Sequence, residues 1–407
     1  MADVEPLNAL HYDLSKVGGL QPVAAPPYDV IDAAQRAELL GRSPYNVVEI
    51  DLPQNGADIY GHAAEILTRW NDEGIVVRDQ APALWALAQD YTGPDGQPRT
   101  RHGVFARVKV TDYGPGRIRP HERTHPGPKE DRLRLTRATR ANLSPIFSLY
   151  DDPANAAWNA VEPFTNDEPW GTVTDEDGTI HKLWRVDDAA AIDAFKAALR
   201  DTELLIADGH HRYETARVYQ QEVPAADHVL MCLVALQDSG LTVFPTHRLA
   251  IGLDADQKHE LATTLEEDWT TEPRDTLSIG YYADGVEQTL YLKHWAIADD
   301  ALEGKPEPYR RLDTAVLEAL LLKGALGMTE DDISHFNGLD YARTPEQARA
   351  KGAAGEADAA FLMTATPVER VRDVAAAGEN MPPKSTYFFP KVLTGMVFNP
   401  LEETWPS

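Results

Sequence analysis

The chain has 407 residues, of which 43% are hydrophobic and 25% charged, and this is typical of a globular protein with two domains. Its formal net charge of −27 argues against nucleic acid as the main partner. The single cysteine, Cys232, excludes an intrachain disulfide and a cysteine-rich zinc site. No apolar stretch has the length of a membrane span and the N-terminus does not resemble a signal peptide, so we expect a cytoplasmic protein without a membrane partner.

The first hundred residues predict a rigid loop, three further elements and a hairpin. Pro26 and Pro27 forbid a helix and fix an extended loop that leads into Asp29. Asp32 is placed to cap the helix that follows. The expected elements are a helix over 33–41, an edge strand over 47–52, a helix over 57–73 and hairpin strands over 85–91 and 104–110.

Residues 117–140 form a basic segment in an otherwise acidic chain, with eight Arg or Lys against three acids. Concentrated positive charge suits a small phosphorylated ligand better than a long polymer. The alternative is a solvent-exposed helix over 129–141 whose arginines pair with acids one turn away. The side chains of this segment that we expect at a ligand are Arg119, His121, Arg123, Arg137 and Arg140.

Residues 151–200 look like an insert, made of a helix, a hairpin around 175–178 and a second helix over 187–200. After it, the apolar run 204–207 predicts a buried strand, and a helix is expected over 213–222. The turn between them reads Asp208-Gly209-His210-His211-Arg212. Because backbone N–H groups and the helix dipole point at the start of a helix, this turn predicts an anion site.

The character of the chain changes near residue 251. Beyond a buried strand over 228–236 we expect a C-terminal α+β domain over 251–407. Its predicted elements are helices over 256–267, 312–325 and 367–377, strands near 276–283, 287–293 and 358–365, and an extended aromatic stretch over 381–398.

Five strings of the sequence resemble a bacterial and archaeal family known as domain of unknown function 1015. Together they extend over nearly the whole chain, and the family carries no established activity that the resemblance could imply. The strings are 26–31, 119–124, 128–132, 207–216 and 384–391.

A local pattern is similar to the ParB/sulfiredoxin superfamily: Pro-Pro-x-Asp, a helix, then a strand ending in Gly-x-His-Arg-Tyr. The resemblance implies a mixed α/β fold with a ParB/sulfiredoxin-like ligand-binding domain over 1–250. In that superfamily a Gly-x-x-Arg turn contacts nucleotide phosphates, members use ATP or CTP, and some relatives phosphorylate free serine. It therefore implies phosphate contacts for Gly209, His211 and Arg212. No DNA-reading helix-turn-helix is apparent.

These observations predict binding of a nucleotide or a phosphorylated small metabolite. The sharpest form is an ATP- or ADP-dependent kinase of a small hydroxy compound, such as a free amino acid. We expect Asp29 as the base, with Glu49 and Asp51 as rivals, and Asp208 as a Mg²⁺ ligand. His211 and Arg212 complete the catalytic set. The expected ligand contacts are Gly209, His210, His211, Arg212, Arg119, His121, Arg123, Arg137, Arg140 and Lys384.

Two other classes of function remain open from the sequence. Convergence of His121 and His125 with His210 and His211 would make a metal-assisted phosphatase or other hydrolase. A protein that binds nucleotide and signals through its C-terminal domain, without turnover, would be a nucleotide-gated sensor.

Overall fold

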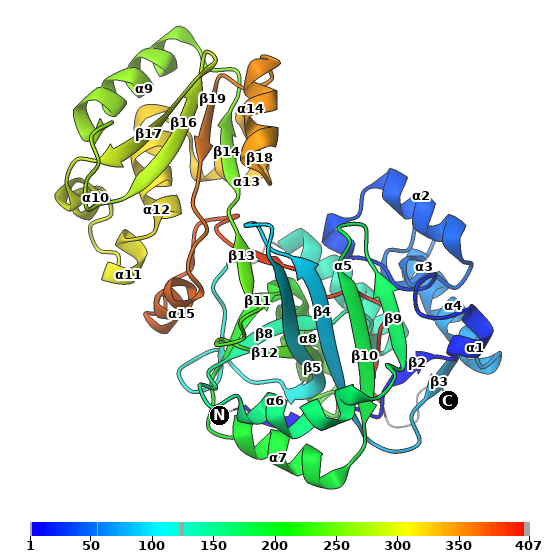
Figure 1. Ribbon diagram of the computed structural model, residues 1–407. Helices are drawn as coiled ribbons and strands as arrows, with labels where there is room; N and C mark the ends of the chain where they lie inside the picture. Colours follow the sequence, from blue (N-terminus) through cyan, green and yellow to red (C-terminus); the bar gives the residue numbers. More distant parts are fainter. Residues whose placement is uncertain (1, 55, 123–125, 403–407) are drawn as a thin grey trace. The chain divides into compact units, whose positions relative to one another are not determined.

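The computed structural model describes residues 2–54, 56–122 and 126–402, and the chain forms two compact units (Figure 1). Unit 1 comprises the chain up to Leu241 together with the stretch that starts at Pro390, and unit 2 is Thr242–Phe389. The sequence predicts a single C-terminal domain over residues 251–407. The stretch after Pro390 departs from that expectation because its backbone bonds to unit 1, where Leu10 and Phe398 form a β-bridge.

A 9-stranded mixed sheet forms the centre of unit 1. Its order is β6-β11-β8-β12-β5-β4-β10-β9, with β1 beside β5. Only β12 with β8 and β11 with β6 are parallel pairs in this described sheet. The strands are β1 (Val4–Glu5), β4 (Leu84–Thr92), β5 (Pro98–Lys109), β6 (Ile118–Arg119), β8 (Ile146–Tyr150), β9 (Gly171–Thr174), β10 (Ile180–Val186), β11 (Leu204–Asp208) and β12 (His228–Ala235).

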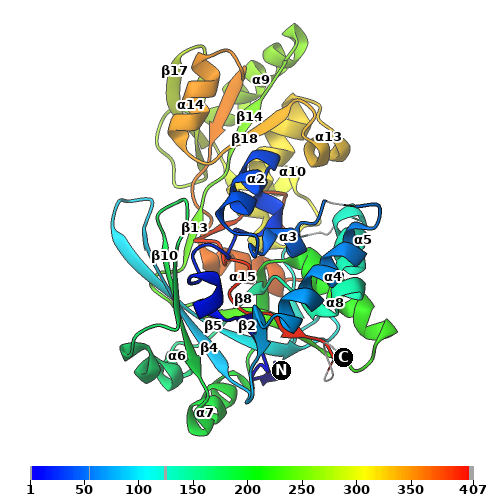
Figure 2. The ribbon, with the colours of Figure 1, turned by 90° about the vertical axis from the view of Figure 1, so that its right-hand side faces the viewer.

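Helices lie on both sides of this sheet, with α6 and α7 on one side and α4, α5 and α8 on the other (Figure 2). Alternation in the strands explains the arrangement, because Val104, Ala106 and Val108 of β5 point into the core beneath α6 and α7. The helices of unit 1 are α1 (Leu14–Val17), η1 (Tyr28–Val30), α2 (Ala33–Arg42), α3 (Val48–Asp51), α4 (Ile59–Asp72), α5 (Pro126–Thr139), α6 (Ala156–Val161), η2 (Glu162–Asn166), α7 (Ala189–Leu199) and α8 (His210–Glu222).

Residues 151–200, expected as an insert, are an integral part of unit 1. Strand β10 pairs with β4 along seven residues, and β9 forms the edge next to it. Trp158 of α6 and Phe195 of α7 belong to the same core cluster as the central strands. The segment therefore completes the sheet and covers one of its faces.

The edge strand expected over 47–52 is wrong, because this segment forms the short helix α3 (Val48–Asp51). Asn46 is fully buried, and its side-chain oxygen accepts a hydrogen bond from the backbone N–H of Val48 at 3.1 Å. Its amide also donates to the carbonyls of Pro22 and Ala24. An Asn side chain that bonds the backbone two residues on favours a turn over an extended strand.

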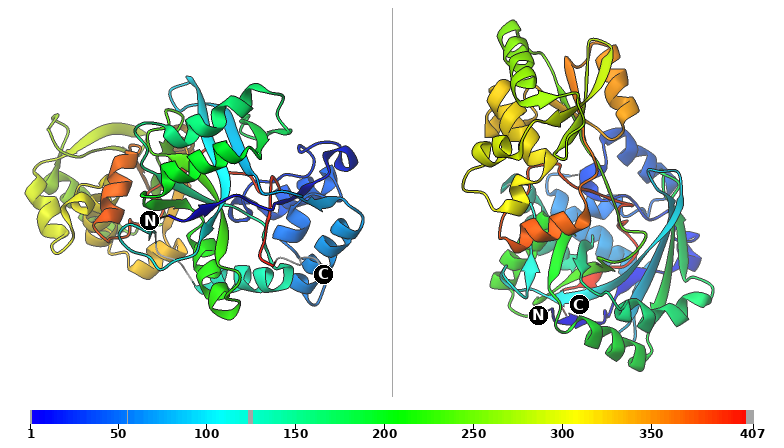
Figure 3. Two further views of the ribbon diagram at one scale, coloured as in Figure 1. Left: turned by 90° about the horizontal axis from the view of Figure 1, so that it is seen from below. Right: turned by 60° about the vertical axis from the view of Figure 1, so that its left-hand side comes forward.

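The stretch from Pro390 runs alongside the N-terminal segment (Figure 3). It contributes a strand to one short ladder and is bridged to a second. Thr394 exchanges backbone hydrogen bonds with Ala25, close to the Pro-Pro loop. The ladders pair β21 (Asn399–Pro400) with β7 (Ala141–Asn142) and β2 (Leu10–Tyr12) with β3 (Val76–Arg78). The stretch from Pro390 therefore closes unit 1 against its N-terminal segment and β7.

Unit 2 contains a 6-stranded antiparallel sheet of order β15-β17-β16-β19-β14-β18 and a separate ladder of β13 with β20. Its helix boundaries lie close to those expected, and a π-helix continues α12. The elements are β13 (Thr242–Phe244), β14 (His247–Ala250), α9 (Ala255–Asp268), β15 (Trp269–Thr270), β16 (Ser278–Ala283), β17 (Val286–Leu292), α10 (Trp295–Ala301), α11 (Glu307–Arg310), α12 (Asp313–Leu317), η3 (Glu318–Ala325), α13 (Glu330–His335), β18 (Leu339–Ala342), α14 (Pro345–Ala353), β19 (Ala359–Leu362), α15 (Val368–Ala376) and β20 (Tyr387–Phe389).

The mixed α/β fold class expected from the sequence is confirmed. Across the described parts of the chain, every helix falls short of the length or the apolar character that a membrane crossing requires.

Candidate functional site

The predicted turn lies between β11 and α8, and the helix begins at His210, earlier than expected. Gly209 is the N-cap residue with φ 97°, in the left-handed region that favours glycine. A Cβ at this position would lie 2.9 Å from Nε of Arg212. Gly209 thus allows the turn and makes room for the arginine, and it offers no side chain to cap the first N–H groups of α8.

Arg212 is held in place by two acceptors. Its Nη2 donates to Oδ1 of Asp208 at 3.2 Å, and its Nη1 donates to the carbonyl of Pro145. Its Nε is buried and has no hydrogen-bond partner among the residues that the structure describes. A buried guanidinium donor without an acceptor is costly, and it is the kind of group that an oxyanion ligand would satisfy.

Asp208 links Arg212 to a second cation, Lys391. The Lys391 ammonium donates to Oδ2 of Asp208 at 2.7 Å. Burial raises the pKa of Asp208, but Lys391 and Arg212 outweigh it and hold the pKa well below its ordinary value. The carboxylate therefore stays charged and keeps both cations at the start of α8.

A buried polar network fixes the backbone that carries Lys391. Arg101 is fully buried, and its Nη2 donates to the carbonyl of Pro390 at 2.5 Å. Gln89 donates to the carbonyl of Lys391 at 3.0 Å and accepts from Nε of Arg101 at 2.9 Å. Burial lowers the pKa of Arg101 to about 10, so the guanidinium remains charged at neutral pH. The sequence offers Lys391, together with Lys384, as a residue that could reach the site, with a surface position as the alternative. The network of Arg101 and Gln89 was not predicted, although two polar residues at inward positions of the hairpin strands were a usable signal.

A pair of buried histidines lies on the other side of the turn. Nδ1 of His121 donates to the carbonyl of Ile206 at 2.6 Å, and the backbone N–H of His121 donates to Nε2 of His210 at 3.3 Å. The two ring centroids are 4.6 Å apart. Burial lowers the pKa of both histidines, so both rings are neutral at pH 7.

Arg132 and Asp51 form a further buried cluster beside Arg212. Nη1 of Arg132 donates to the carbonyl of Asp51 at 2.7 Å, and the guanidinium lies 4.0 Å from the centre of the Tyr28 ring. Ser144 donates to Oδ2 of Asp51 at 2.7 Å. Burial raises the pKa of Asp51, while Arg132 and Ser144 oppose the change. A cavity of about 30 Å³ between this cluster and Arg212 is large enough for one or two water molecules.

The structure brings some of the predicted residues together and separates others. Gly209, His210, Arg212 and His121 meet at the turn with Asp208, and His211 follows within the same helix. Asp29 is exposed in η1. Burial raises the pKa values of the nearby Tyr28 and Asp51, and the Asp29 charge adds a smaller contribution in the same direction.

The remaining arginines of the basic segment bond to acids elsewhere. Arg119 pairs with Glu203 at 2.9 Å, next to the start of β11. Arg137 pairs with Glu222 at 2.6 Å, at the far end of α8, about 20 Å from the turn by helix rise. Arg140 pairs with Glu402 at 3.1 Å. The structure therefore does not bring Arg137 and Arg140 to the turn, because Arg137 of α5 pairs at the opposite end of α8 and Arg140, just after α5, pairs with the C-terminal stretch.

Two predicted contacts fall elsewhere in the chain. Arg123 lies outside the described residues, as does His125. Lys384 belongs to unit 2, where its φ is 57° and its carbonyl accepts a hydrogen bond from Arg248 at 3.2 Å.

The donor set does not favour a metal ion at Asp208. Both of its carboxylate oxygens already bond to cations, Oδ1 to Arg212 and Oδ2 to Lys391. The backbone carbonyl of Ile206 already accepts from Nδ1 of His121, and Nε2 of His210 already accepts from the backbone N–H of His121. Within residues 2–54, 56–122 and 126–402, no three His, Cys, Asp or Glu side chains are arranged to hold a metal.

Several solved structures show likeness to this chain at low identity. One is a conserved hypothetical protein from Pyrococcus furiosus, with 15% identity, coverage of 70% of this chain and 90% of that chain, and a TM-score of 0.35. A free serine kinase in complex with AMP has 16% identity, coverage of 70% and 86%, and a TM-score of 0.36. SbnI with a C-terminal truncation, from Staphylococcus aureus, has 14% identity, coverage of 73% and 87%, and a TM-score of 0.38.

No curated protein matches the chain. The pattern of one family matches residues 4–315, which include the Pro-Pro loop, the basic segment and the turn at Gly209. The chain belongs to this family, described as Protein of unknown function (DUF1015).

Proposed function

We propose that unit 1 binds the phosphate of a nucleotide or phosphorylated small metabolite at the start of α8. The observation that carries this proposal is the buried Nε of Arg212, which lacks a partner among the described residues and lies against Gly209. The first N–H groups of α8 have no side-chain cap and supply further donors at the same place. A phosphate oxygen there would receive charge-assisted and backbone hydrogen bonds together.

The charges around the turn suit an anion. Lys391 and Arg212 add two positive charges, and Asp208 balances one of them. The neutral His121 and His210 add hydrogen-bonding groups without adding charge. Fixed cations and dipoles of this kind stabilise charge that develops during phosphoryl transfer, because they need no rearrangement as the charge moves.

In its sharpest form the proposed activity is transfer of a phosphoryl group from ATP or ADP to the hydroxyl of a small metabolite, with a free amino acid as one acceptor class. Asp29 accepts the hydroxyl proton while the oxygen–phosphorus bond forms and the bond from phosphorus to the leaving nucleotide oxygen breaks. Asp29 is exposed after the rigid Pro26-Pro27 loop, whereas both oxygens of Asp51 are engaged by Arg132 and Ser144. Mg²⁺ would be held mainly by the phosphates.

The test combines binding with turnover on the full-length chain. Calorimetric titration with AMP, ADP and ATP is run on the wild type, on Arg212→Gln and on Arg137→Gln, a matched arginine at the other end of α8. We expect Arg212→Gln to weaken binding by at least about tenfold, the loss of one charge-assisted hydrogen bond, and Arg137→Gln to leave it unchanged. Equal affinities in all three proteins would refute the site.

Turnover separates the classes of function. Phosphorus NMR of ATP or ADP with a panel of hydroxy compounds should show a new phosphate ester, and Asp29→Asn should abolish it while nucleotide still binds. Release of phosphate without an acceptor would instead identify a hydrolase. Binding without any conversion would identify a sensor.

A further inference from the structure

A wider cavity lies at the opposite end of α8 from the turn. It has a volume of about 690 Å³, within the range of small-molecule sites. All of its lining residues belong to unit 1. They come from the N-terminal segment between β1 and β2, from the loop after α8, from β3, β5 and β12, and from the returning C-terminal stretch. Helix rise places it about 20 Å from Gly209, so it is separate from the site proposed above.

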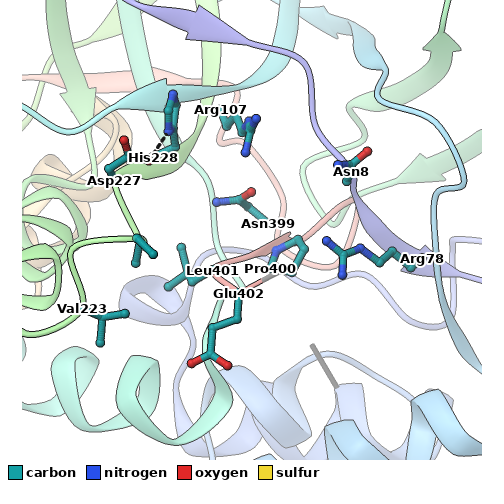
Figure 4. A pocket seen from close by; sticks show the side chains of 12 residues that line it. Asn8, Arg78, Arg107, Val223, Asp227, His228, Asn399, Pro400, Leu401 and Glu402 are labelled. Carbon is teal, nitrogen blue, oxygen red and sulfur yellow. Dashed lines mark hydrogen bonds and ion pairs between the residues drawn. The ribbon is translucent and has the colours of Figure 1, made fainter. Parts of the chain in front are cut away.

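Two nitrogen atoms at this cavity lack partners among the described residues. They are Nε of Arg107 and Nε2 of His228, and both are buried. The other ring nitrogen of His228 donates to Oδ1 of Asp227 at 2.6 Å, which orients the imidazole. Figure 4 shows the His228, Arg107 and Asn399 side chains on one side of the cavity and Glu402 on the opposite side.

The acids of the lining already have a hydrogen-bond or ion-pair partner. Asp227 bonds to His228, and Glu402 pairs with Arg140 at 3.1 Å. Two arginines, Arg78 and Arg107, line the same cavity. A guanidinium presents N–H donors that match the oxygens of a carboxylate or phosphate, so the donor without a partner here, Nε of Arg107, calls for an oxyanion acceptor.

We propose that this cavity binds a small metabolite through a carboxylate or phosphate group, with Arg107 and His228 as its anchors. Nε of Arg107 donates to the oxyanion, and Nε2 of His228 accepts a hydrogen bond from a hydroxyl or N–H group of the same metabolite. Asn399 is held by its amide hydrogen bond to Asn142 at 2.9 Å and forms a fixed polar wall. The site is independent of phosphoryl transfer and remains if the turn at Gly209 proves inert.

The experiment titrates the full-length chain with inorganic phosphate and with succinate by calorimetry. Since phosphate also probes the start of α8, the reference protein carries Arg212→Gln. Arg107→Gln is added to remove the anchor, and Arg69→Gln, an exposed arginine of α4, serves as the control. Ala225→Trp fills the rim of the cavity from an exposed position and leaves every charge in place.

We expect at least one of the two anions to bind the reference protein at millimolar concentration. Arg107→Gln and Ala225→Trp should each weaken that binding by about tenfold or more, and Arg69→Gln should not change it. Binding of phosphate alone or of succinate alone supports the site and fixes the shape of the oxyanion. Binding of neither, or binding that survives Ala225→Trp undiminished, overturns the proposal. The binding result for Arg107→Gln is interpreted only if the melting temperature of this variant matches that of the reference protein. If it does not match, the result for Ala225→Trp tests the proposal.

Discussion

The two ends of helix α8 differ in how the nearby positive side chains are packed: at one end they are enclosed in ion pairs, and at the other they border a wide cavity. At the N-terminal end, Arg212 and Lys391 share Asp208 inside a packed network, and the adjoining cavity is about 30 Å³. At the C-terminal end, Arg78 and Arg107 line a cavity of about 690 Å³. The Arg and His residues of the sequence are most concentrated around the N-terminal end of α8, whereas the larger cavity lies at its C-terminal end. Local composition therefore indicates which functional side chains are present, whereas the packing of segments distant in the sequence decides whether a cavity lies beside them.

The largest expected effect comes from removing one cation at the packed end. Lys391→Met leaves the Asp208 carboxylate largely buried with Arg212 as its remaining ion-pair partner, so the free energy of unfolding should fall by about 3 kcal/mol. Urea denaturation at pH 7 measures it. A loss below about 1 kcal/mol, typical of surface pairs, would show that the two ends do not differ as described.

The next effect sharpens the role of the turn itself. Gly209→Ala forces a side chain into a positive φ and toward Nε of Arg212, and should cost about 2 kcal/mol of stability as well as nucleotide binding. Gly41→Ala is the matched control, because Gly41 lies inside α2 with nothing near its Cβ position. That substitution should leave stability equal or slightly higher. A similar loss in both variants would contradict the assigned role of Gly209.

Acid should weaken the packed end through its histidines. Since the folded pKa values of His121 and His210 lie below the ordinary 6.5, the unfolded chain takes up protons first as the pH falls. Their contribution is complete above pH 6.5 and is lost progressively below it. Between pH 6.5 and 5.5 the unfolding free energy of the wild type should fall by about 1 kcal/mol more than that of His210→Gln. Unfolding curves of the two proteins at both pH values measure this difference. Parallel curves for the two proteins would show that His210 titrates normally.

The smallest effect is expected at the open end of α8. Arg137→Met breaks the exposed pair with Glu222 and should change the free energy of unfolding by less than about 0.5 kcal/mol. High salt should reduce even that difference, since exposed pairs are screened. A loss comparable to that of Lys391→Met would remove the contrast between the two ends.

The strand, glycine and helix start around Gly209 were readable because all three signals are local. The contact between His121 and His210 was also predictable, because the sequence places His121 in the basic segment and His210 in the anion turn, and both were expected at one ligand. Lys384 and Lys391 were both candidates for the site, and the sequence could not decide between them because a partner 183 positions away from Asp208 leaves no local pattern. Arg137 and Arg140 were misplaced because charge density does not reveal which way a helix such as α5 points its side chains.

Other errors have the same origin in non-local packing. The apolar alternation of 47–52 suggested a strand, but the buried Asn46 side chain supplies hydrogen bonds that favour a helical turn. Residues 151–200 looked separable because they have their own turn signals, yet Leu183 and Trp184 of β10 pair with the central hairpin.

The return of the chain at Pro390 has a consequence for biosynthesis. Residues of the last stretch, such as Thr394 and Phe398, exchange backbone hydrogen bonds with Ala25 and Leu10, which leave the ribosome nearly a whole chain earlier. Unit 1 therefore cannot close until the stretch from Pro390 has been made, whereas unit 2 is contiguous in the sequence. A nascent chain stalled before residue 390 should therefore expose the unfinished half to proteases and chaperones, and a premature stop there would yield a product without a completed unit 1.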